Sequence, residues 1–189
     1  RARAALGFAR HSNMLRFLIL FLLIQMSLFG LELWQPVHQG VIVPFTALIA
    51  HVSATLMQAF DPDVIWHGVV IQSRQTGFGV SIEAGCNGVE ACIVLIAAVL
   101  AFPAPWKSRA LALAVGLIAV QALNLVRIIS LYYLGKWNIP AFGQMSLFEF
   151  AHLYLWQALI MLDVLVVWLL WVRYLAARGQ FRLGARRAA

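Results

Sequence analysis

The stretch ALALAVGLIAVQALNLVRIISLYYL, Ala110–Leu134, carries one charged residue, Arg127. About 20 consecutive apolar residues in a helix are enough to cross a hydrocarbon core of ~30 Å. The stretch is therefore a predicted transmembrane helix. It is typical of the whole chain of 189 residues, of which 63% are hydrophobic and only 11% are charged, with a mean hydropathy of +0.86. These values place the chain in the class of integral membrane proteins.

Other segments are also long and apolar enough to cross a membrane. The predicted spans are Leu15–Trp34, Gly88–Phe102, Ala110–Leu134 and Phe150–Val172. The first follows a basic segment, but its apolar run is long and no small-residue cleavage site stands out after it, so we expect an uncleaved anchor. A fifth segment, Val41–Phe60, contains several polar residues, and we interpret it as an amphipathic or re-entrant helix. The predicted fold is an all-α polytopic helix bundle of five to six helices.

Charge predicts the orientation of the bundle. Basic residues gather before the first span, in one short turn and after the last span, which are cytoplasmic positions under the positive-inside rule. Eleven of the fourteen basic residues follow this pattern: Arg1, Arg3, Arg10, Arg16, Lys107, Arg109, Arg173, Arg178, Arg182, Arg186 and Arg187. Six of the seven acidic residues fall at or near the opposite face: Glu32, Asp61, Asp63, Glu83, Glu90 and Glu149.

Two consequences follow from this charge distribution. Both termini on the cytoplasmic side demand an even number of crossings, so Val41–Phe60 is not expected to cross. Five crossings would put the N-terminus outside and contradict the leading arginines. The net charge of +7 would also suit a nucleic-acid-binding protein, but basic residues confined to the ends and one turn favour membrane orientation instead. We expect the lipid bilayer, and no nucleic acid, as a partner.

One segment between the spans has a strand-like pattern. Phe78, Val80 and Ile82 alternate with smaller or polar residues, and Val64–Ile71 is rich in β-branched side chains. We predict a small extracytoplasmic β-hairpin over residues 61–85. Residues 1–14 and 174–189 are expected to be basic cytoplasmic tails of a single membrane-embedded domain, 1–189.

Cys86 lies where the strand-like stretch gives way to a helix, in Gly85-Cys86-Asn87-Gly88. The partial positive charge of a helix N-terminus would favour the thiolate form of this side chain. A small buried cysteine with a packing role is the alternative interpretation. A disulfide with Cys92 is not expected, because six helical residues rise ~9 Å, which is beyond the ~7 Å that a disulfide bridges.

Arg127 is predicted to lie ~10 Å inside the outer end of its helix. A buried arginine at such a depth faces a bundle interior or a water-filled cavity. Asn124 and Ser130, three positions to either side, lie on the same helical flank. Two structural alternatives remain at this stage, namely snorkelling to the interface and an ion pair with Glu90.

His152 begins the last span, with Trp156 on the same face, and Glu149 one turn earlier is a candidate to orient the imidazole. The topology places Cys86, Arg127 and His152 in the outer third of the membrane. A thiol, a guanidinium and an imidazole are suited to act as nucleophile, anion stabiliser and acid or base. The supporting residues expected around them are Asn87, Gly88, Glu90, Asn124, Glu149 and Trp156.

These residues resemble the signature blocks of a known family. Cys86-Asn87-Gly88, the run from Asn124 to Arg127, and His152 are similar to the three blocks of the exosortase/archaeosortase family, which resembles sortases in function but not in fold. The similarity covers roughly Val41 to Trp171. The sequence Cys-Asn-Gly-Val-Glu, the Ala-Phe-Pro that follows, and Trp156-Gln157 look most like exosortase H.

The resemblance implies a cysteine transpeptidase of the bacterial cytoplasmic (inner) membrane, with its active site on the extracytoplasmic side and no cofactor. Its partners would be exported proteins with a C-terminal sorting signal, made of a motif similar to Ile-Pro-Thr-Leu and Trp-Gly, a hydrophobic helix and a basic tail. By position, Cys86 would form a thioester, Arg127 would stabilise the oxyanion and His152 would protonate the leaving amine. One departure is Leu153, where many exosortases have an aspartate.

Two other functional classes remain open. A small membrane transporter or assembly scaffold would use Arg127, Glu90 and Asn124 as a polar pathway or network, with Cys86 incidental. A thiol redox protein would use Cys86 and Cys92, but their spacing argues against it. The sequence contains neither an H-E-x-x-H nor a G-x-S-x-G motif, so it supports neither a metal-dependent nor a serine mechanism.

Overall fold

The computed structural model describes residues 2–138, 140 and 145–179, with backbone alone for residues 2–12. Most of these residues are helical. The elements in chain order are α1 (Ala2–Leu33), α2 (Gln35–Val37), a π-helical turn η1 (His38–Ile42), α3 (Val43–Gln58), β1 (Val64–His67), β2 (Val70–Ser73), β3 (Gly79–Ser81), α4 (Val89–Ala101), α5 (Trp106–Trp137), α6 (Leu147–Phe150), a second π-helical turn η2 (Ala151–Leu155) and α7 (Trp156–Ala177).

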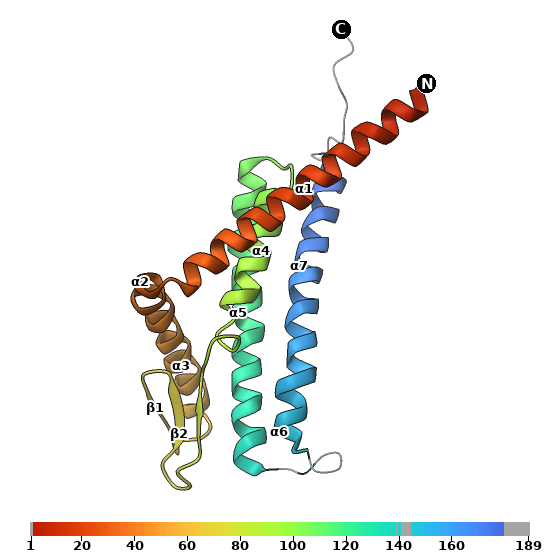
Figure 1. Ribbon diagram of the computed structural model, residues 1–189. Helices are drawn as coiled ribbons and strands as arrows, with labels where there is room; N and C mark the ends of the chain where they lie inside the picture. Colours follow the sequence, from red (N-terminus) through yellow and green to blue (C-terminus); the bar gives the residue numbers. More distant parts are fainter. Residues whose placement is uncertain (1, 139, 141–144, 180–189) are drawn as a thin grey trace.

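The described helices have two distinct ends (Figure 1). The start of α1, the turn between α4 and α5, and the end of α7 all lie at one end of the molecule, the top of Figure 1. Lys107 and Arg109 stand at the start of α5, and Arg173 and Arg178 stand at the end of α7, so we call this the basic end. The sheet and the start of α6 lie at the opposite end, the sheet end. The described chain therefore starts and finishes at one end, as an even number of crossings requires.

Four helical segments are long and apolar enough to cross a membrane, which confirms the predicted class of fold. They are Asn13–Leu33, Gln35–Gln58, Trp106–Trp137 and Leu147–Ala177, while the apolar helix Val89–Ala101 is shorter. The prediction from the sequence differs in detail. It counted Gly88–Phe102 among the clear spans and treated Val41–Phe60 as the segment whose crossing was uncertain.

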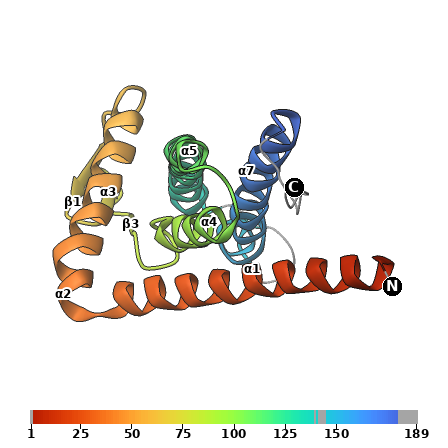
Figure 2. The same ribbon diagram turned by 90° about the horizontal axis from the view of Figure 1, so that it is seen from above.

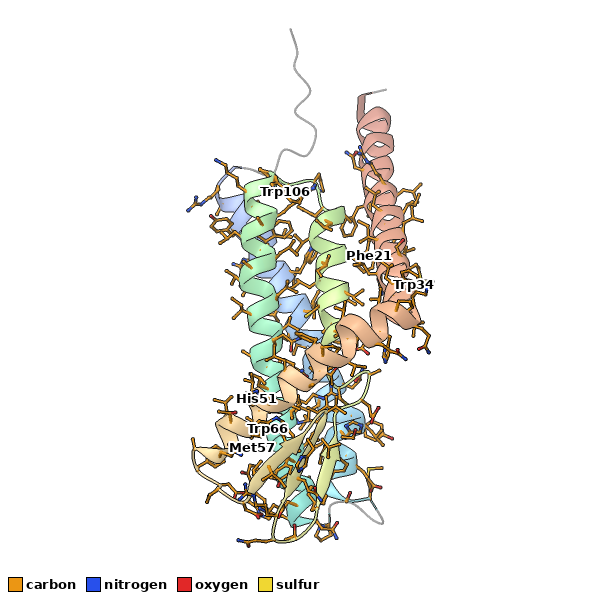
Figure 3. All side chains as sticks on the ribbon, turned by 90° about the vertical axis from the view of Figure 1, so that its left-hand side faces the viewer. Phe21, Trp34, His51, Met57, Trp66 and Trp106 are labelled. Carbon is orange, nitrogen blue, oxygen red and sulfur yellow. The ribbon has the colours of Figure 1, made fainter. Side chains whose placement is uncertain are left out.

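The path of the chain explains this difference. In Figure 3, Trp34 at the end of α1 lies between Trp106, at the basic end, and Met57, near the sheet end. Helix α3 continues from there to the sheet end and does not return (Figure 1). Helices α1 and α3 together thus cover the length that α5 covers alone. The return path is made by the segment after the sheet and by α4, so α4 is short.

The predicted hairpin is present and has one more strand than expected. The order of the antiparallel sheet is β1-β2-β3. Gly68, with φ +58°, allows a tight turn that divides the expected strand Val64–Ile71 in two. Ile71 then pairs with Trp66 on one side and with Val80 on the other.

The two larger hydrophobic clusters among the described residues flank α5, which lies centrally in the view of Figure 2. The sheet-side cluster joins α3, the sheet and the later part of α5: Ile49, Ala50, Ala54, Met57, Val64, Ile71, Ile82, Ile128 and Tyr132. The bundle cluster joins α4, α5 and α7: Ala91, Leu95, Val99, Ala112, Val120, Ile160, Val164, Trp171 and Leu175. Because α5 contributes to both clusters, its side chains lie where the two regions meet.

Candidate active site

Cys86 lies in the connection between β3 and α4, as the sequence predicted. Its backbone N–H donates to the carbonyl of Glu83 at 2.9 Å, which closes a turn. Gly85 before it has φ +83°, a conformation that favours glycine. The Asn87 Oδ1 atom accepts from the backbone N–H of Val89 at 3.0 Å, at the first residue of α4. The thiol is therefore presented on a short, well-defined loop just before the helix.

Two neighbours of Cys86 anchor this loop to other helices. The buried Asn87 side chain donates from Nδ2 to Thr46 Oγ1 on α3 at 3.1 Å. Gly88 has φ +76°, and a Cβ atom there would lie 2.8 Å from Gln121 Nε2 and 3.0 Å from Asn124 Nδ2 on α5. Asn87 thus anchors the loop to α3 through its side chain, and Gly88 allows the loop to approach α5 closely because it has no side chain. Sequence reasoning missed Thr46, because a threonine in an apolar helix carries no signal of a partner 41 residues away.

Arg127 contacts the cysteine directly. The residue is 3% exposed, and its guanidinium donates from Nη1 to the Gly85 carbonyl at 2.9 Å and lies with Nη2 3.5 Å from Cys86 Sγ. This geometry excludes snorkelling. The proposed ion pair with Glu90 is also absent from the described part of the chain, where Glu90 instead accepts a hydrogen bond from the backbone N–H of Gly85. Glu90 and Arg127 therefore hold Gly85 from its two sides.

Asn124 lies on the same flank of α5 as Arg127, as predicted, and is completely buried. Its Nδ2 atom donates to Gln121 Oε1 at 3.4 Å, and Gln121 Nε2 reaches the carbonyl of Asn87, also at 3.4 Å. Asn124 Oδ1 has no hydrogen-bond partner among the described residues. This pair of amides supports the cysteine loop through the Asn87 carbonyl.

His152 enters the site from the other side, on the π-helical turn η2 at the start of the last long helix. Such turns are frequent at functional sites because they shift side chains relative to a regular helix. The imidazole stacks on Phe148, with ring centroids 5.7 Å apart and an interplanar angle of 4°. Its Nδ1 atom is buried and has no hydrogen-bond partner in the described residues.

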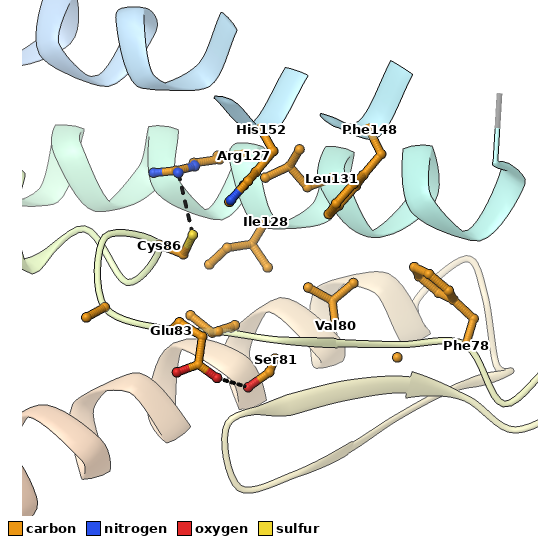
Figure 4. A pocket seen from close by; sticks show the side chains of 13 residues that line it. Phe78, Val80, Ser81, Glu83, Cys86, Arg127, Ile128, Leu131, Phe148 and His152 are labelled. Atoms are coloured by element: carbon orange, nitrogen blue, oxygen red, sulfur yellow. Dashed lines mark hydrogen bonds between the residues drawn. The ribbon is translucent and has the colours of Figure 1, made fainter. Parts of the chain in front are cut away.

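One cavity of about 400 Å³ brings the three predicted groups together (Figure 4). This volume is within the usual range for ligand sites. The cavity is lined by Phe78, Gly79, Val80, Ser81, Ile82, Glu83, Ala84, Cys86, Arg127, Ile128, Leu131, Phe148 and His152. The reactive side chains lie at one end of it, and apolar side chains form most of the remaining wall.

Two predicted supporting residues have other roles in the structure. The Glu149 carboxylate accepts from the backbone N–H of Ser146 at 2.8 Å and from its hydroxyl at 3.1 Å, in a capping box at the start of α6. It is thus used as a helix cap and does not orient His152. Trp156 packs with Leu131 and Ala151 in a buried cluster and does not line the cavity. The interpretation of Glu149 as the orienting carboxylate is wrong.

The electrostatic environment of Cys86 also differs from expectation. Burial raises the pKa of its thiol, the positive charge of Arg127 lowers it, and the nearby carboxylates of Glu90 and Glu83 raise it, with a net rise. The helix N-terminus was expected to favour the thiolate, and that prediction is wrong for the site without substrate. A buried thiol with a raised pKa needs a base to become a nucleophile, and the imidazole of His152 lines the same cavity.

The second cysteine is separate from this chemistry. Both cysteines are free, and the sulfur of Cys92 accepts a hydrogen bond from Gln121 Nε2 at 3.4 Å. The prediction that they form no disulfide is confirmed. In the part of the chain that the structure describes, no three His, Cys, Asp or Glu side chains converge in a way that would hold a metal ion.

A family model described as "Transmembrane exosortase (Exosortase_EpsH)" matches residues 4–169 of the chain. No curated protein and no solved structure matched. The matched range contains every residue that lines the cavity and extends from α1 into α7.

Proposed function

Because the chain belongs to the transmembrane exosortase family, we propose that it is a membrane-embedded cysteine transpeptidase or protease that cleaves the C-terminal sorting signal of exported proteins. The observation that carries this proposal is the shared cavity. A thiol, a buried guanidinium 3.5 Å from its sulfur, and an imidazole line one space of about 400 Å³. These are the groups that acyl transfer through a thioester requires.

The first step would form the bond between sulfur and carbon. His152 takes the proton of the Cys86 thiol as Sγ attacks the scissile peptide carbonyl, and the carbonyl oxygen becomes an oxyanion. Arg127 is held by the Gly85 carbonyl through Nη1, which leaves Nη2 beside the sulfur and near the carbon to which the sulfur bonds. A fixed donor at this position stabilises the oxyanion as its charge develops.

The second step would break the peptide bond. The tetrahedral intermediate collapses, the C–N bond breaks, and His152 returns its proton to the leaving amine, which departs with the apolar helix and basic tail. A thioester between the exported protein and Cys86 remains. A second nucleophile, an acceptor amine or hydroxyl or water, then attacks this thioester, loses its proton to His152 and releases the sulfur.

The orientation of the chain is part of the same proposal. The basic end carries Lys107, Arg109, Arg173 and Arg178, and basic residues mark the cytoplasmic side of a membrane protein. The sheet end would then face the extracytoplasmic side of the cytoplasmic membrane. A substrate anchored by its own C-terminal helix would present the bond just outside that helix to the cavity.

The test is co-expression of the chain with a secreted reporter that ends in an Ile-Pro-Thr-Leu and Trp-Gly motif, an apolar helix and a basic tail. We expect tail removal and a covalent adduct on Cys86 by mass spectrometry. The variant Cys86→Ala should lower cleavage at least about a thousandfold without changing the thermal unfolding midpoint, whereas Cys92→Ala should cleave normally. Equal cleavage by Cys86→Ala and the wild type would reject the proposal and favour a non-catalytic scaffold or transporter.

A further inference from the structure

Strand β3 has one edge that no strand occupies among the residues that the structure describes. In the sheet order β1-β2-β3 it pairs with β2 alone, with Ile71 opposite Val80. The other edge borders the cavity, which is lined by the unbroken run from Phe78 to Ala84. In Figure 4, this run lies between β2 and the side chains of Arg127 and His152. The unpaired edge therefore faces the proposed catalytic groups.

The register shows which backbone groups this edge presents. Ser73 donates its N–H to the Phe78 carbonyl at 2.8 Å, and Ile82 donates to the Val69 carbonyl at 3.0 Å. In an antiparallel pair the backbone groups of successive residues point alternately to the two sides. Phe78, Val80 and Ile82 thus point their backbone groups towards β2. The N–H and C=O groups of Gly79 and Ser81 point to the open edge, and both residues are exposed.

An open strand edge is energetically unfavourable in a membrane protein. Unpaired backbone groups are not tolerated against lipid, and they persist only in protein or in a water-filled cavity. Natural proteins also protect free edges, because such edges readily accept another strand. This edge is short, borders a cavity and ends close to the nucleophile, which is the arrangement expected of a strand that receives a ligand.

We propose that β3 binds the segment of the substrate that precedes the scissile bond as a fourth, extended strand, through the backbone groups of Gly79 and Ser81. This inference rests on the proposed function and specifies how that site holds its substrate. The occupant is an extended peptide because an open edge offers hydrogen bonds only to free backbone groups. A helix uses these groups internally, and a lipid chain has none.

The geometry also gives the direction of the bound segment. The chain rises from the sheet end through β3 to Cys86 and the start of α4 (Figure 1). In the proposed orientation, the exported part of the substrate precedes its apolar helix and enters from the sheet end. The substrate segment therefore runs parallel to β3. Alternate side chains of this segment would face the apolar wall of Phe78, Val80, Leu131 and Phe148.

The first test compares two substitutions at one position. Ser81→Pro removes the N–H that points to the open edge, and proline is tolerated on edge strands because the pairing with β2 does not use that group. Ser81→Ala keeps the N–H and removes only the hydroxyl, which donates to Glu83 at 2.6 Å. We expect Ser81→Pro to cleave the reporter at least about tenfold more slowly than Ser81→Ala, because a substrate carbonyl loses its donor.

Two controls show that the site itself is intact. The thermal unfolding midpoint and the rate at which iodoacetamide alkylates Cys86 should be the same in the two Ser81 variants. Equal cleavage by Ser81→Pro and Ser81→Ala would overturn the inference while leaving the proposed function in place. Failure of the wild type to cleave the reporter would count against the proposed function instead.

A second test changes the substrate and leaves the protein untouched. The purified chain is given a synthetic sorting tail in which one backbone nitrogen at a time, N-terminal to the scissile bond, is methylated. Successive residues of a strand point their N–H groups to opposite sides. Methylation at every second residue should therefore slow cleavage about tenfold or more, and methylation at the residues between them should have little effect on the rate. Effects without this alternation would exclude an added strand, even if Ser81→Pro does not fold.

Discussion

The bundle cluster and the region around the sheet-side cluster share α5 but are held together differently. In the bundle, apolar side chains pack closely, and a Cβ atom on Gly116 would lie 2.7 Å from Leu95 Cδ2. At the sheet end, Lys136 forms both of the salt bridges found among the described residues, to Asp61 at 3.1 Å and to Asp63 at 3.0 Å. The bundle relies mainly on close packing, whereas the sheet end adds salt bridges and hydrogen bonds to its own apolar cluster.

The difference reflects the two solvents of a membrane protein. Lipid is as apolar as leucine, so helices within it associate through close packing and small residues. Charged groups become favourable only where water or a polar cavity is available. The cysteine loop and Arg127 lie where the two regions meet. Reactive, hydrogen-bonding groups can therefore be held there by a rigid apolar bundle on one side and reached from the polar region on the other.

The largest effect is expected when the link between the two regions is broken. Arg127→Gln removes the charge beside Cys86 and weakens the hold on the Gly85 carbonyl. Loss of one oxyanion donor costs about a hundredfold to a thousandfold in turnover, measured as the rate of reporter cleavage. Arg127→Lys should recover little, because an ammonium group cannot donate to the carbonyl and face the sulfur as a planar guanidinium does. Cleavage within twofold of wild type by Arg127→Gln would contradict this role.

Substitution of two glycines in the cysteine loop can separate the cost of backbone strain from the cost of overpacking. Gly85 and Gly88 have φ +83° and +76°, but a Cβ atom meets nothing within 4 Å at Gly85 and lies 2.8 Å from Gln121 Nε2 at Gly88. Gly85→Ala should cost about 1–2 kcal/mol from the left-handed conformation alone. Gly88→Ala should cost that amount and about 1–3 kcal/mol more from overpacking.

Chemical denaturation in detergent measures both changes in the free energy of unfolding. We predict that Gly88→Ala loses more stability than Gly85→Ala. The two substitutions share the cost of the left-handed backbone conformation and differ only in the space around the added methyl group. An equal loss of stability in Gly85→Ala and Gly88→Ala would show that the cysteine loop is not packed against α5.

The raised pKa of Cys86 gives a smaller, pH-dependent effect. Burial raises the pKa of the thiol and Arg127 partly offsets this. Alkylation by iodoacetamide requires the thiolate, so its rate in the wild type should rise with pH, with a midpoint above that of an exposed cysteine. In Arg127→Gln the midpoint should move higher still, because the favourable positive charge is gone. A shift to lower pH would mean that Arg127 does not act electrostatically on the sulfur.

The smallest effect is expected at the sheet end. Hydrogen bonding from Ser73 lowers the pKa of Asp63, partial burial opposes this, and Lys136 lowers it further, to about 2 from an ordinary value of 3.8. Since the folded pKa is depressed, the ionised carboxylate stabilises the fold above pH 3.8, and this contribution is lost as the pH falls towards 2.

Thermal unfolding of Asp63→Asn checks this sign. The variant should unfold at a temperature a few degrees below the wild type at pH 7, and the difference should shrink as both proteins are measured at lower pH. A difference that is constant down to pH 3 would show that the charge of Asp63 contributes nothing, and that its role is limited to the hydrogen bonds with Ser73 and Gln75.

The comparison also shows where sequence reasoning succeeded. The class of protein, the strand-like segment after Asp61 and the position of Cys86 between strand and helix were all predicted. Each depends on local composition or on a short repeat. The same reasoning expected Arg127 to face a bundle interior or a water-filled cavity, because a charge in an apolar helix must find polar surroundings.

Its failures concern residues whose role depends on distant partners. Glu149 is one turn from His152 in sequence, but its carboxylate is taken by Ser146 at the start of α6. Cys86 was expected to be a favoured thiolate, yet burial in the cavity raises its pKa. The partner of Thr46 was also not expected, because its buried hydrogen bond with Asn87 joins residues 41 positions apart.

The sequence by itself determined that this chain is a membrane protein of several spans with basic residues at its ends, and which side chains are chemically reactive. These properties follow from hydrophobicity and charge counted along the chain. Only the tertiary structure decided that Arg127 contacts Cys86 and that β3 has a free edge beside both. Such contacts join residues dozens of positions apart, and they depend on how helices and strands pack, which local composition does not specify.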